Sequence, residues 1–107
     1  SQFEFAADGV HPGREGHWLM AREIILQVFG FDVRNVPTVE NMFAHHGGKI
    51  RELVEQRMRI LWRAWMTRIG HSRPHVPGGP DSEPGPPLPE AEQKALEIGE
   101  TIAHLLE

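Results

Sequence analysis

Apolar positions recur every three or four residues along three stretches of the chain, a spacing that predicts three amphipathic helices. The first covers residues 14–29 and is followed by Gly30, a residue typical of helix ends. The second and clearest covers residues 49–69 and stops at Gly70. The third covers residues 89–106, where one stripe is formed by Ala91, Ala95, Ile98, Ile102 and Leu105. We therefore expect this chain alone to be predominantly α-helical.

The segments around these helices carry shorter patterns. The alternation Phe3-Glu4-Phe5 predicts the end of a strand or an extended approach, and residues 8–13 predict a loop because Gly and Pro punctuate them. Thr38 is a suitable N-cap for a short helix over residues 38–45, which Gly47-Gly48 would break. Residues 74–89 contain seven prolines and three glycines, which predicts a linker or an extended surface strap.

Charge is distributed unevenly, although the net charge is only -4. Residues 49–73 hold seven Lys and Arg against two acidic residues, a net +5, and residues 74–107 hold one against seven, a net -6. A basic segment can serve nucleic acid or another anionic surface. The acidic total favours a solvated helix face neutralised by the acidic tail, so nucleic acid is not expected as a partner. The arginines concerned are Arg51, Arg57, Arg59, Arg63 and Arg68.

Composition excludes some kinds of chemistry. The chain has no cysteine, so it has no disulfide framework and no catalytic thiol. No apolar run is long enough to span a bilayer, and the first five residues do not read as a signal peptide. These features leave the compartment open, since disulfide-free proteins occur both inside and outside cells.

Seven histidines raise the question of a metal site. His45 and His46 are adjacent, so on a helix they would point about 100° apart and would not converge on one ion. His71 and His75 flank a proline-containing loop, without the four spaced ligands of a structural zinc site. We expect no metal and no cofactor.

The three tryptophans could form a platform for sugars or acyl chains. Trp62 and Trp65 stand three residues apart on the apolar face of the second helix, so we expect them to pack against neighbouring elements instead. Trp18 lies in the first turns of the first helix, beside His17.

The segment Asp8-x-x-His11-Pro12 has a catalytic logic. A hydroxyl nucleophile is weak until an imidazole takes its proton, and a carboxylate bonded to the other ring nitrogen fixes the tautomer of that imidazole. Placing Asp8 three residues before His11 on one tight turn lets a single loop supply both groups. The alternative is a helix-entry loop in which Asp8 accepts backbone N–H bonds and His11 is solvated.

The wider stretch 8–21 resembles the last conserved block of the SGNH (GDSL-type) ester hydrolases. In that block D-G-x-H-P is followed by a short polar spacer, by G-H and by a helix of small and apolar residues. Gly16-His17 and Leu19-Met20-Ala21 stand at the matching positions. Residues 55–61 and 64–71, with Arg73-Pro74 after them, are also similar to a C-terminal extension found in a bacterial subgroup of these hydrolases.

The resemblance implies a parent α/β fold, an α/β/α sandwich on a parallel sheet. It implies that His11 is the general base and that Asp8 orients it, while a serine in a G-D-S block, a Gly and an Asn complete the site. The serines present are Ser1, Ser72 and Ser82, and none has that context. The nucleophile is therefore expected outside this chain, in a missing N-terminal part or in a second chain.

By this interpretation the chain divides by role into a catalytic block (1–30), a helical extension (31–73), a linker (74–89) and a terminal helix (90–107). The implied substrate is an ester, either an acylated small molecule or an acylated carbohydrate. Export to the periplasm or beyond would follow by analogy with relatives, and an oligomer is left open.

A different class of function fits the helices equally well. Residues 14–69 could form a small helical module for protein interaction, with the acidic terminal helix docking on a partner or on the basic middle. Such a module has no need of an Asp-x-x-His turn, and this reading leaves that stretch unexplained.

Overall fold

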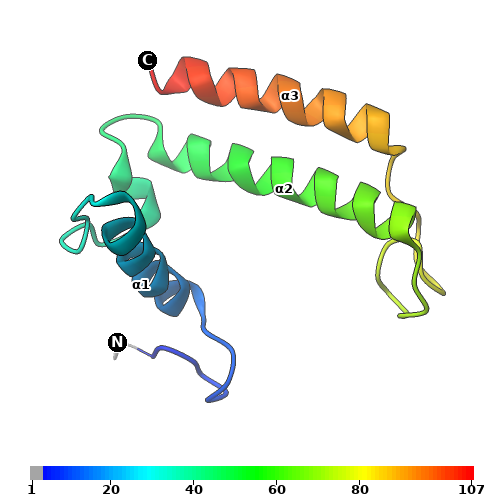
Figure 1. The fold of residues 1–107 in the computed structure, drawn as a ribbon, viewed down its shortest axis with the longest axis horizontal. Helices are drawn as coiled ribbons and strands as arrows, with labels where there is room; N and C mark the ends of the chain where they lie inside the picture. Colours follow the sequence, from blue (N-terminus) through cyan, green and yellow to red (C-terminus); the bar gives the residue numbers. More distant parts are fainter. Residues whose placement is uncertain (1–3) are drawn as a thin grey trace. The chain divides into compact units, whose positions relative to one another are not determined.

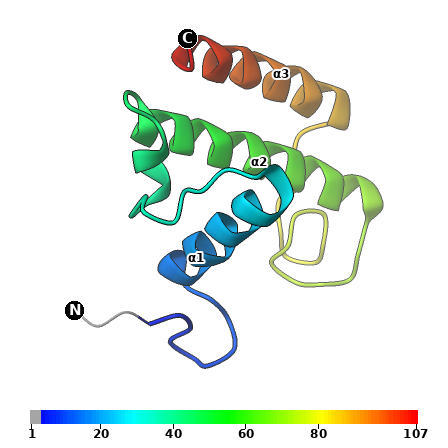
Figure 2. The same ribbon diagram turned by 60° about the vertical axis from the view of Figure 1, so that its left-hand side comes forward.

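The computed structural model describes residues 4–107, and the described chain consists of helices and loops without a strand (Figures 1 and 2). The prediction that this chain alone is predominantly α-helical is confirmed. Glu4 and Phe5 belong to no strand, and Phe3 lies outside the described residues. The chain forms two compact units, Ser1–Gly47 and Gly48–Glu107, which are described separately below.

The first unit is built on α1 (Arg14–Ile24), which passes directly into a π-helical turn, η1 (Ile25–Phe29). Gly30 ends this helix in the left-handed region, with φ 76°, and its N–H donates to the Leu26 carbonyl over 3.0 Å. A left-handed residue at this position is the usual role of glycine after a helix. The predicted helix over residues 14–29 is thus confirmed, with a last turn wider than an α-helix.

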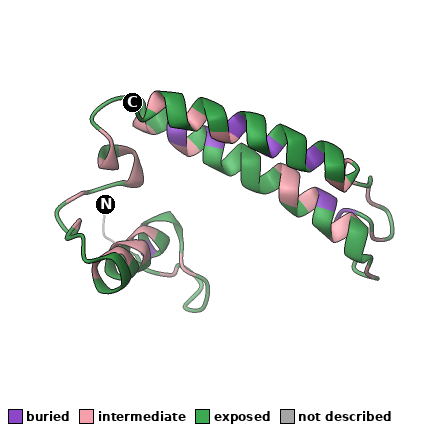
Figure 3. Cartoon of the chain, turned by 45° about the horizontal axis from the view of Figure 1, so that its top comes forward, coloured by how far each residue is buried: buried purple, intermediate pink, exposed green. Residues whose placement is uncertain are grey.

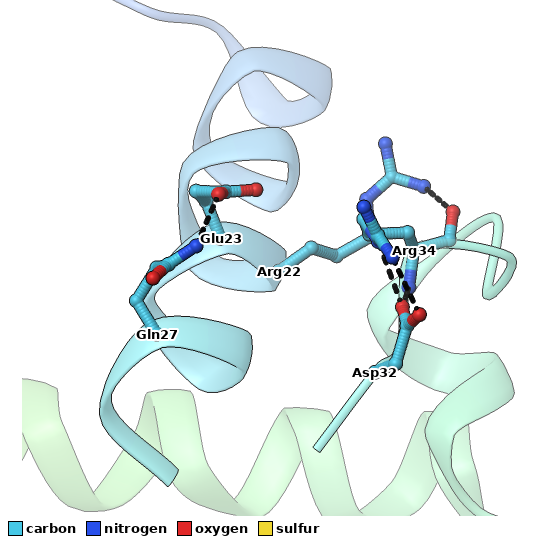
Figure 4. A network of polar contacts seen from close by, with 5 residues as sticks. All are labelled: Arg22, Glu23, Gln27, Asp32 and Arg34. Atoms are coloured by element: carbon cyan, nitrogen blue, oxygen red, sulfur yellow. Dashed lines mark hydrogen bonds and ion pairs between the residues drawn. The ribbon is translucent and has the colours of Figure 1, made fainter. Parts of the chain in front are cut away.

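The segment after Gly30 is held against α1 by polar side chains (Figure 4). The Trp18 indole donates to the Val36 carbonyl over 2.8 Å, and the Arg22 guanidinium donates to the Arg34 carbonyl. Arg34 forms a two-pronged ion pair with Asp32, at 2.9 and 2.7 Å. Trp18 therefore has a structural partner within its own unit.

The predicted helix over residues 38–45 is wrong. Only η2 (Val39–Met42), a single 3₁₀ turn, forms there. The Thr38 hydroxyl donates to the Asn41 side chain over 2.6 Å instead of capping the backbone, and Phe43 is already extended at φ -118°. One short turn with no capping hydrogen bond has too few internal bonds to propagate as a helix.

The expected break at Gly47-Gly48 is also wrong, because both glycines belong to the first turn of α2 (Gly47–Ile69). Gly47 is required by close packing: a Cβ at this position would lie 1.9 Å from the Glu40 carbonyl oxygen. The glycine at position 47 therefore allows the Glu40 carbonyl to approach the backbone closely, and the pair does not mark a helix end.

In the second unit, α2 and α3 (Leu88–Leu105) run antiparallel and side by side (Figures 1 and 2). Apart from Pro77, the buried apolar side chains of the described residues lie on these two helices (Figure 3), namely Ile50, Leu53, Ala64, Ala91, Ala95 and Ile98. The Arg57 Nε of α2 donates to the Ala95 carbonyl of α3 over 3.2 Å, which links the two helices. Each buried Leu or Ile contributes roughly 1.5–3 kcal/mol.

The proline-rich segment forms a strap that packs on the C-terminal half of α2. The Gly85 N–H donates to Thr67 Oγ1 over 2.8 Å, and this hydroxyl donates to the Arg63 carbonyl over 2.9 Å. A Cβ at Gly85 would lie 2.4 Å from the Arg63 carbonyl oxygen. Of the two structures expected for residues 74–89, the strap is therefore the one observed.

The expectation that Trp62 and Trp65 pack against neighbouring elements is wrong, since 49% and 46% of their surfaces are exposed. In the described part of the chain, no helix combines the length and the apolar character needed to cross a membrane.

Candidate active site

Asp8 and His11 meet on the loop that leads into α1. One carboxylate oxygen of Asp8, Oδ2, lies 2.7 Å from Nδ1 of the His11 ring. The other, Oδ1, accepts the backbone N–H of Val10 at 2.9 Å and that of His11 at 2.7 Å. One carboxylate thus closes the turn and orients the imidazole, so both roles considered for Asp8 from the sequence are present together.

The charge of Asp8 is favoured by these contacts. Its pKa is lowered from 3.8 to about 2, first by the hydrogen bond from the His11 backbone, then by the His11 ring and the Val10 backbone. Hydrogen bonds to an ionised carboxylate stabilise that form over the protonated one. At neutral pH Asp8 is therefore a fixed negative charge against Nδ1 of His11.

The loop itself is shaped by glycine and tied to the start of α1. Gly9 adopts φ 77° and donates its N–H to the Ala6 carbonyl over 3.0 Å. The Gly13 N–H donates to the Phe5 carbonyl, also over 3.0 Å. The loop therefore returns on itself before the helix begins, which holds Asp8 and His11 on a defined turn.

Gly16 makes this return possible. It is buried in the first turn of α1, and a Cβ there would lie 2.4 Å from the Phe5 carbonyl oxygen and 3.1 Å from Pro12 Cβ. Sequence reasoning placed Gly16 in the family-like block but did not assign it this supporting role. The contact with Phe5 left no sequence signal, because it is made by a backbone carbonyl.

The far nitrogen of His11 is available for chemistry. The His11 side chain is 82% exposed, and its Nε2 has no hydrogen-bond partner among residues 4–107. A ring that donates from Nδ1 to a carboxylate presents an unprotonated Nε2 in its neutral form. The pair can therefore accept a proton at Nε2, as a general base must.

The other sequence candidates lie elsewhere. His17 is exposed beside the loop and contributes its backbone N–H to the Gly13 carbonyl over 2.9 Å. Ser72 and Ser82 belong to the second unit, where Ser82 Oγ is 3.5 Å from the Glu83 carbonyl. Ser1 lies outside the described residues.

The remaining histidines have structural surroundings. His45 and His46 lie in the bend before α2, not on a helix, with their rings edge to face at 6.4 Å. His71 Nε2 lies 2.9 Å from the Pro77 carbonyl, and His71 Nδ1 accepts the Arg73 N–H over 3.2 Å. Both contacts hold the ring against the strap. Residues 4–107 contain no group of three or more His, Cys, Asp or Glu that could hold a metal ion.

Comparison with known proteins returns no family model, no curated protein and no solved structure that matches this chain. The resemblance to the SGNH hydrolases therefore depends on the sequence segments that carry it, residues 8–21 together with 55–61 and 64–74.

Proposed function

We propose that residues 1–30 supply the general base and its orienting carboxylate to a serine ester hydrolase of the SGNH type. The observation that carries the proposal is the 2.7 Å contact between Asp8 Oδ2 and His11 Nδ1, with Nε2 of the same ring exposed. A loop that only led into a helix would need the backbone contacts of Asp8 but not its contact with the ring.

In the proposed reaction a serine hydroxyl from outside this chain attacks the ester carbonyl while His11 Nε2 takes its proton. Asp8 stabilises the imidazolium that forms. The tetrahedral intermediate collapses as His11 returns the proton to the leaving alcohol, and an acyl-serine remains. Water then attacks the acyl-serine while His11 Nε2 takes a proton from it. His11 returns this proton to the serine oxygen as the acid leaves, which restores the serine.

The exposure of His11 fits a shared site. A base that is 82% exposed is hydrated and would act on a serine only where a second surface covers it and excludes water. Neither Ser72 nor Ser82 has a Gly-Asp-Ser context, so we assign the nucleophile, and the groups that bind the oxyanion, to the remaining part of the parent fold. The proposed substrate class is an acylated small molecule or carbohydrate, as the family resemblance implies.

The test is native mass spectrometry of the material purified from its source, with N-terminal sequencing, followed by hydrolysis of a short-chain nitrophenyl ester. We expect a covalently or non-covalently attached segment that bears a Gly-Asp-Ser serine. We also expect His11→Ala to lower kcat by at least about 10³-fold. His45→Gln is the matched control, because His45 is an exposed histidine of the same unit outside the loop. Full activity in His11→Ala would contradict the proposal.

The alternative of a helical interaction module is favoured by one observation, the exposed apolar side chains on α2. The two functions do not exclude each other, because α2 belongs to the second unit and the Asp8–His11 pair to the first.

A further inference from the structure

A line of exposed apolar side chains runs along α2 from residue 54 to its last residue, 69. Its members recur at steps of four, four, three and four residues, and between 41% and 71% of their surfaces are exposed. This apolar stripe consists of Val54, Met58, Trp62, Trp65 and Ile69. The same helix buries Ile50, Leu53 and Ala64, so α2 has two apolar faces.

The stripe and the buried face point in different directions. At about 100° per residue, the five stripe residues fall within an arc of about 80°, and the centre of the buried set lies about a third of a turn away. On the side of the buried set, Arg57 Nε donates to the Ala95 carbonyl of α3 over 3.2 Å, and the strap lies against Ala64 at Gly85. α3 therefore leaves the stripe uncovered.

The chemistry around the stripe is cationic. Arg59 and Arg68 flank it on either side, both are exposed, and neither guanidinium has a partner among the described residues. Glu55, a carboxylate at its edge, is paired with Arg51 over 2.8 Å. Residues 49–73 carry a net charge of +5 and residues 74–107, which include α3, carry -6, so the cationic character is local to the two arginines at the margins of the stripe.

The two tryptophans add a second feature. Each is about half exposed, and neither indole N–H has a hydrogen-bond partner within residues 4–107. Indoles with an apolar body and an unsatisfied N–H are favoured at the boundary between lipid headgroups and acyl chains, where both parts find suitable surroundings. A helix with tryptophan on its apolar face and arginine at its margins is typical of helices that lie in this boundary.

We propose that the apolar stripe of α2 docks on the surface of an anionic phospholipid bilayer, parallel to the membrane plane. The stripe enters the headgroup region, and Arg59 and Arg68 extend to the lipid phosphates. A second copy of the chain fits the same face less well, because pairing two such stripes would place the flanking arginines, Arg59 and Arg68, of both copies at one interface. This docking is independent of the proposed hydrolase function.

The test is co-sedimentation of the full chain with vesicles of phosphatidylcholine alone and with about 30% phosphatidylserine, at about 0.1 M salt. We expect binding to the anionic vesicles, with a blue shift of tryptophan emission, and at least tenfold weaker binding to the neutral ones. Arg59→Gln/Arg68→Gln should weaken binding to anionic vesicles roughly 30-fold, at about one kcal/mol for each arginine. Met58→Ser/Trp62→Ser should lower it at least about tenfold.

Two control variants separate this role from folding. Leu96→Ser changes a leucine of α3 that is 57% exposed, and Lys94→Gln removes a cation from the same helix. Both should bind as the unchanged chain does, with equal helical circular dichroism in all variants. Equal binding to neutral and anionic vesicles, or full binding by the stripe variant, would overturn the proposal. If the unchanged chain is a dimer in the absence of lipid and Met58→Ser/Trp62→Ser is a monomer, the membrane proposal is overturned and a second copy of the chain is the occupant of the stripe.

Discussion

Asp8 combines two functions that are often divided between residues. Its Oδ1 organises the turn through the backbone of Val10 and His11, and its Oδ2 contacts the His11 ring at 2.7 Å. The local fold and the orientation of the candidate base therefore depend on the same negative charge. Any change that neutralises Asp8 should disturb both at once.

The first prediction concerns the titration of Asp8. Because its pKa is lowered from 3.8 to about 2, its contacts stabilise the turn fully above pH 3.8 and are lost as the pH falls through about 2. The Asp8 carboxyl ¹³C shift should titrate with a midpoint near 2, together with the amide shifts of Val10 and His11. A midpoint near 3.8 would show that these hydrogen bonds do not form in solution.

The second prediction concerns the tautomer of the His11 ring. Long-range ¹H–¹⁵N correlation at about pH 8, above the ordinary titration of imidazole, should show the proton on Nδ1 and a bare Nε2. In Asp8→Asn the ring should move toward the mixture of tautomers found in free histidine. His45 provides an internal reference, because it has no carboxylate partner among the described residues. Identical spectra for His11 in the two proteins would contradict the orienting role of Asp8.

At the scale of elements, the loop and α1 are joined through Gly16. A Cβ at this position would lie 2.4 Å from the Phe5 carbonyl oxygen, so Gly16→Ala must push the returning loop away. We expect a loss of about 1–3 kcal/mol in the free energy of unfolding of this unit and faster amide exchange at residue 13. Gly13→Ala is the matched control, because nothing lies within 4 Å of a Cβ there. Equal stability of the two variants would show that Phe5 does not pack on Gly16.

The same reasoning applies to the strap on α2. A Cβ at Gly85 would lie 2.4 Å from the Arg63 carbonyl oxygen, so Gly85→Ala should cost about 1–3 kcal/mol of stability in chemical denaturation. Gly99, in the interior of α3, has open space around the corresponding position. Gly99→Ala should therefore stabilise the unit by up to about 1 kcal/mol. A strap that detaches from α2 in solution would leave Gly85→Ala neutral.

The long helices were predictable because each carries its own period of apolar residues, and the first two are also followed by a glycine, Gly30 and Gly70. The segment around Thr38 was not, since its capping and apolar signals were local, while the backbone is set by contacts with α1 and Glu40. Periodicity also identified the apolar residues of α2, but it could not show which of them are buried and which are exposed. The strap lies against Ala64 at Gly85, whereas Trp62 and Trp65 remain about half exposed.

The candidate site was also predictable only in part. The spacing of Asp8 and His11 on a glycine-containing turn was enough to predict that the two side chains meet. The supporting contacts were not, because they are made by the backbone carbonyls of Phe5 and Ala6, which have no signature in the sequence. The division into a catalytic block and a helical extension remains a prediction from the resemblance.

At the scale of the whole molecule, the two units carry different features. The first carries the Asp8–His11 pair, and the second carries the apolar stripe of α2. The central claim is that His11 activates a serine outside residues 1–107.

The most direct measurement is labelling of the natural assembly with a fluorophosphonate probe, which reacts with serines activated by a histidine base. We predict that one serine in a Gly-Asp-Ser segment outside residues 1–107 is labelled, and that His11→Ala abolishes this labelling while His45→Gln does not. Labelling that is unchanged in His11→Ala, or an assembly with no reactive serine, would contradict the account and leave the Asp8–His11 pair as a structural feature of the turn.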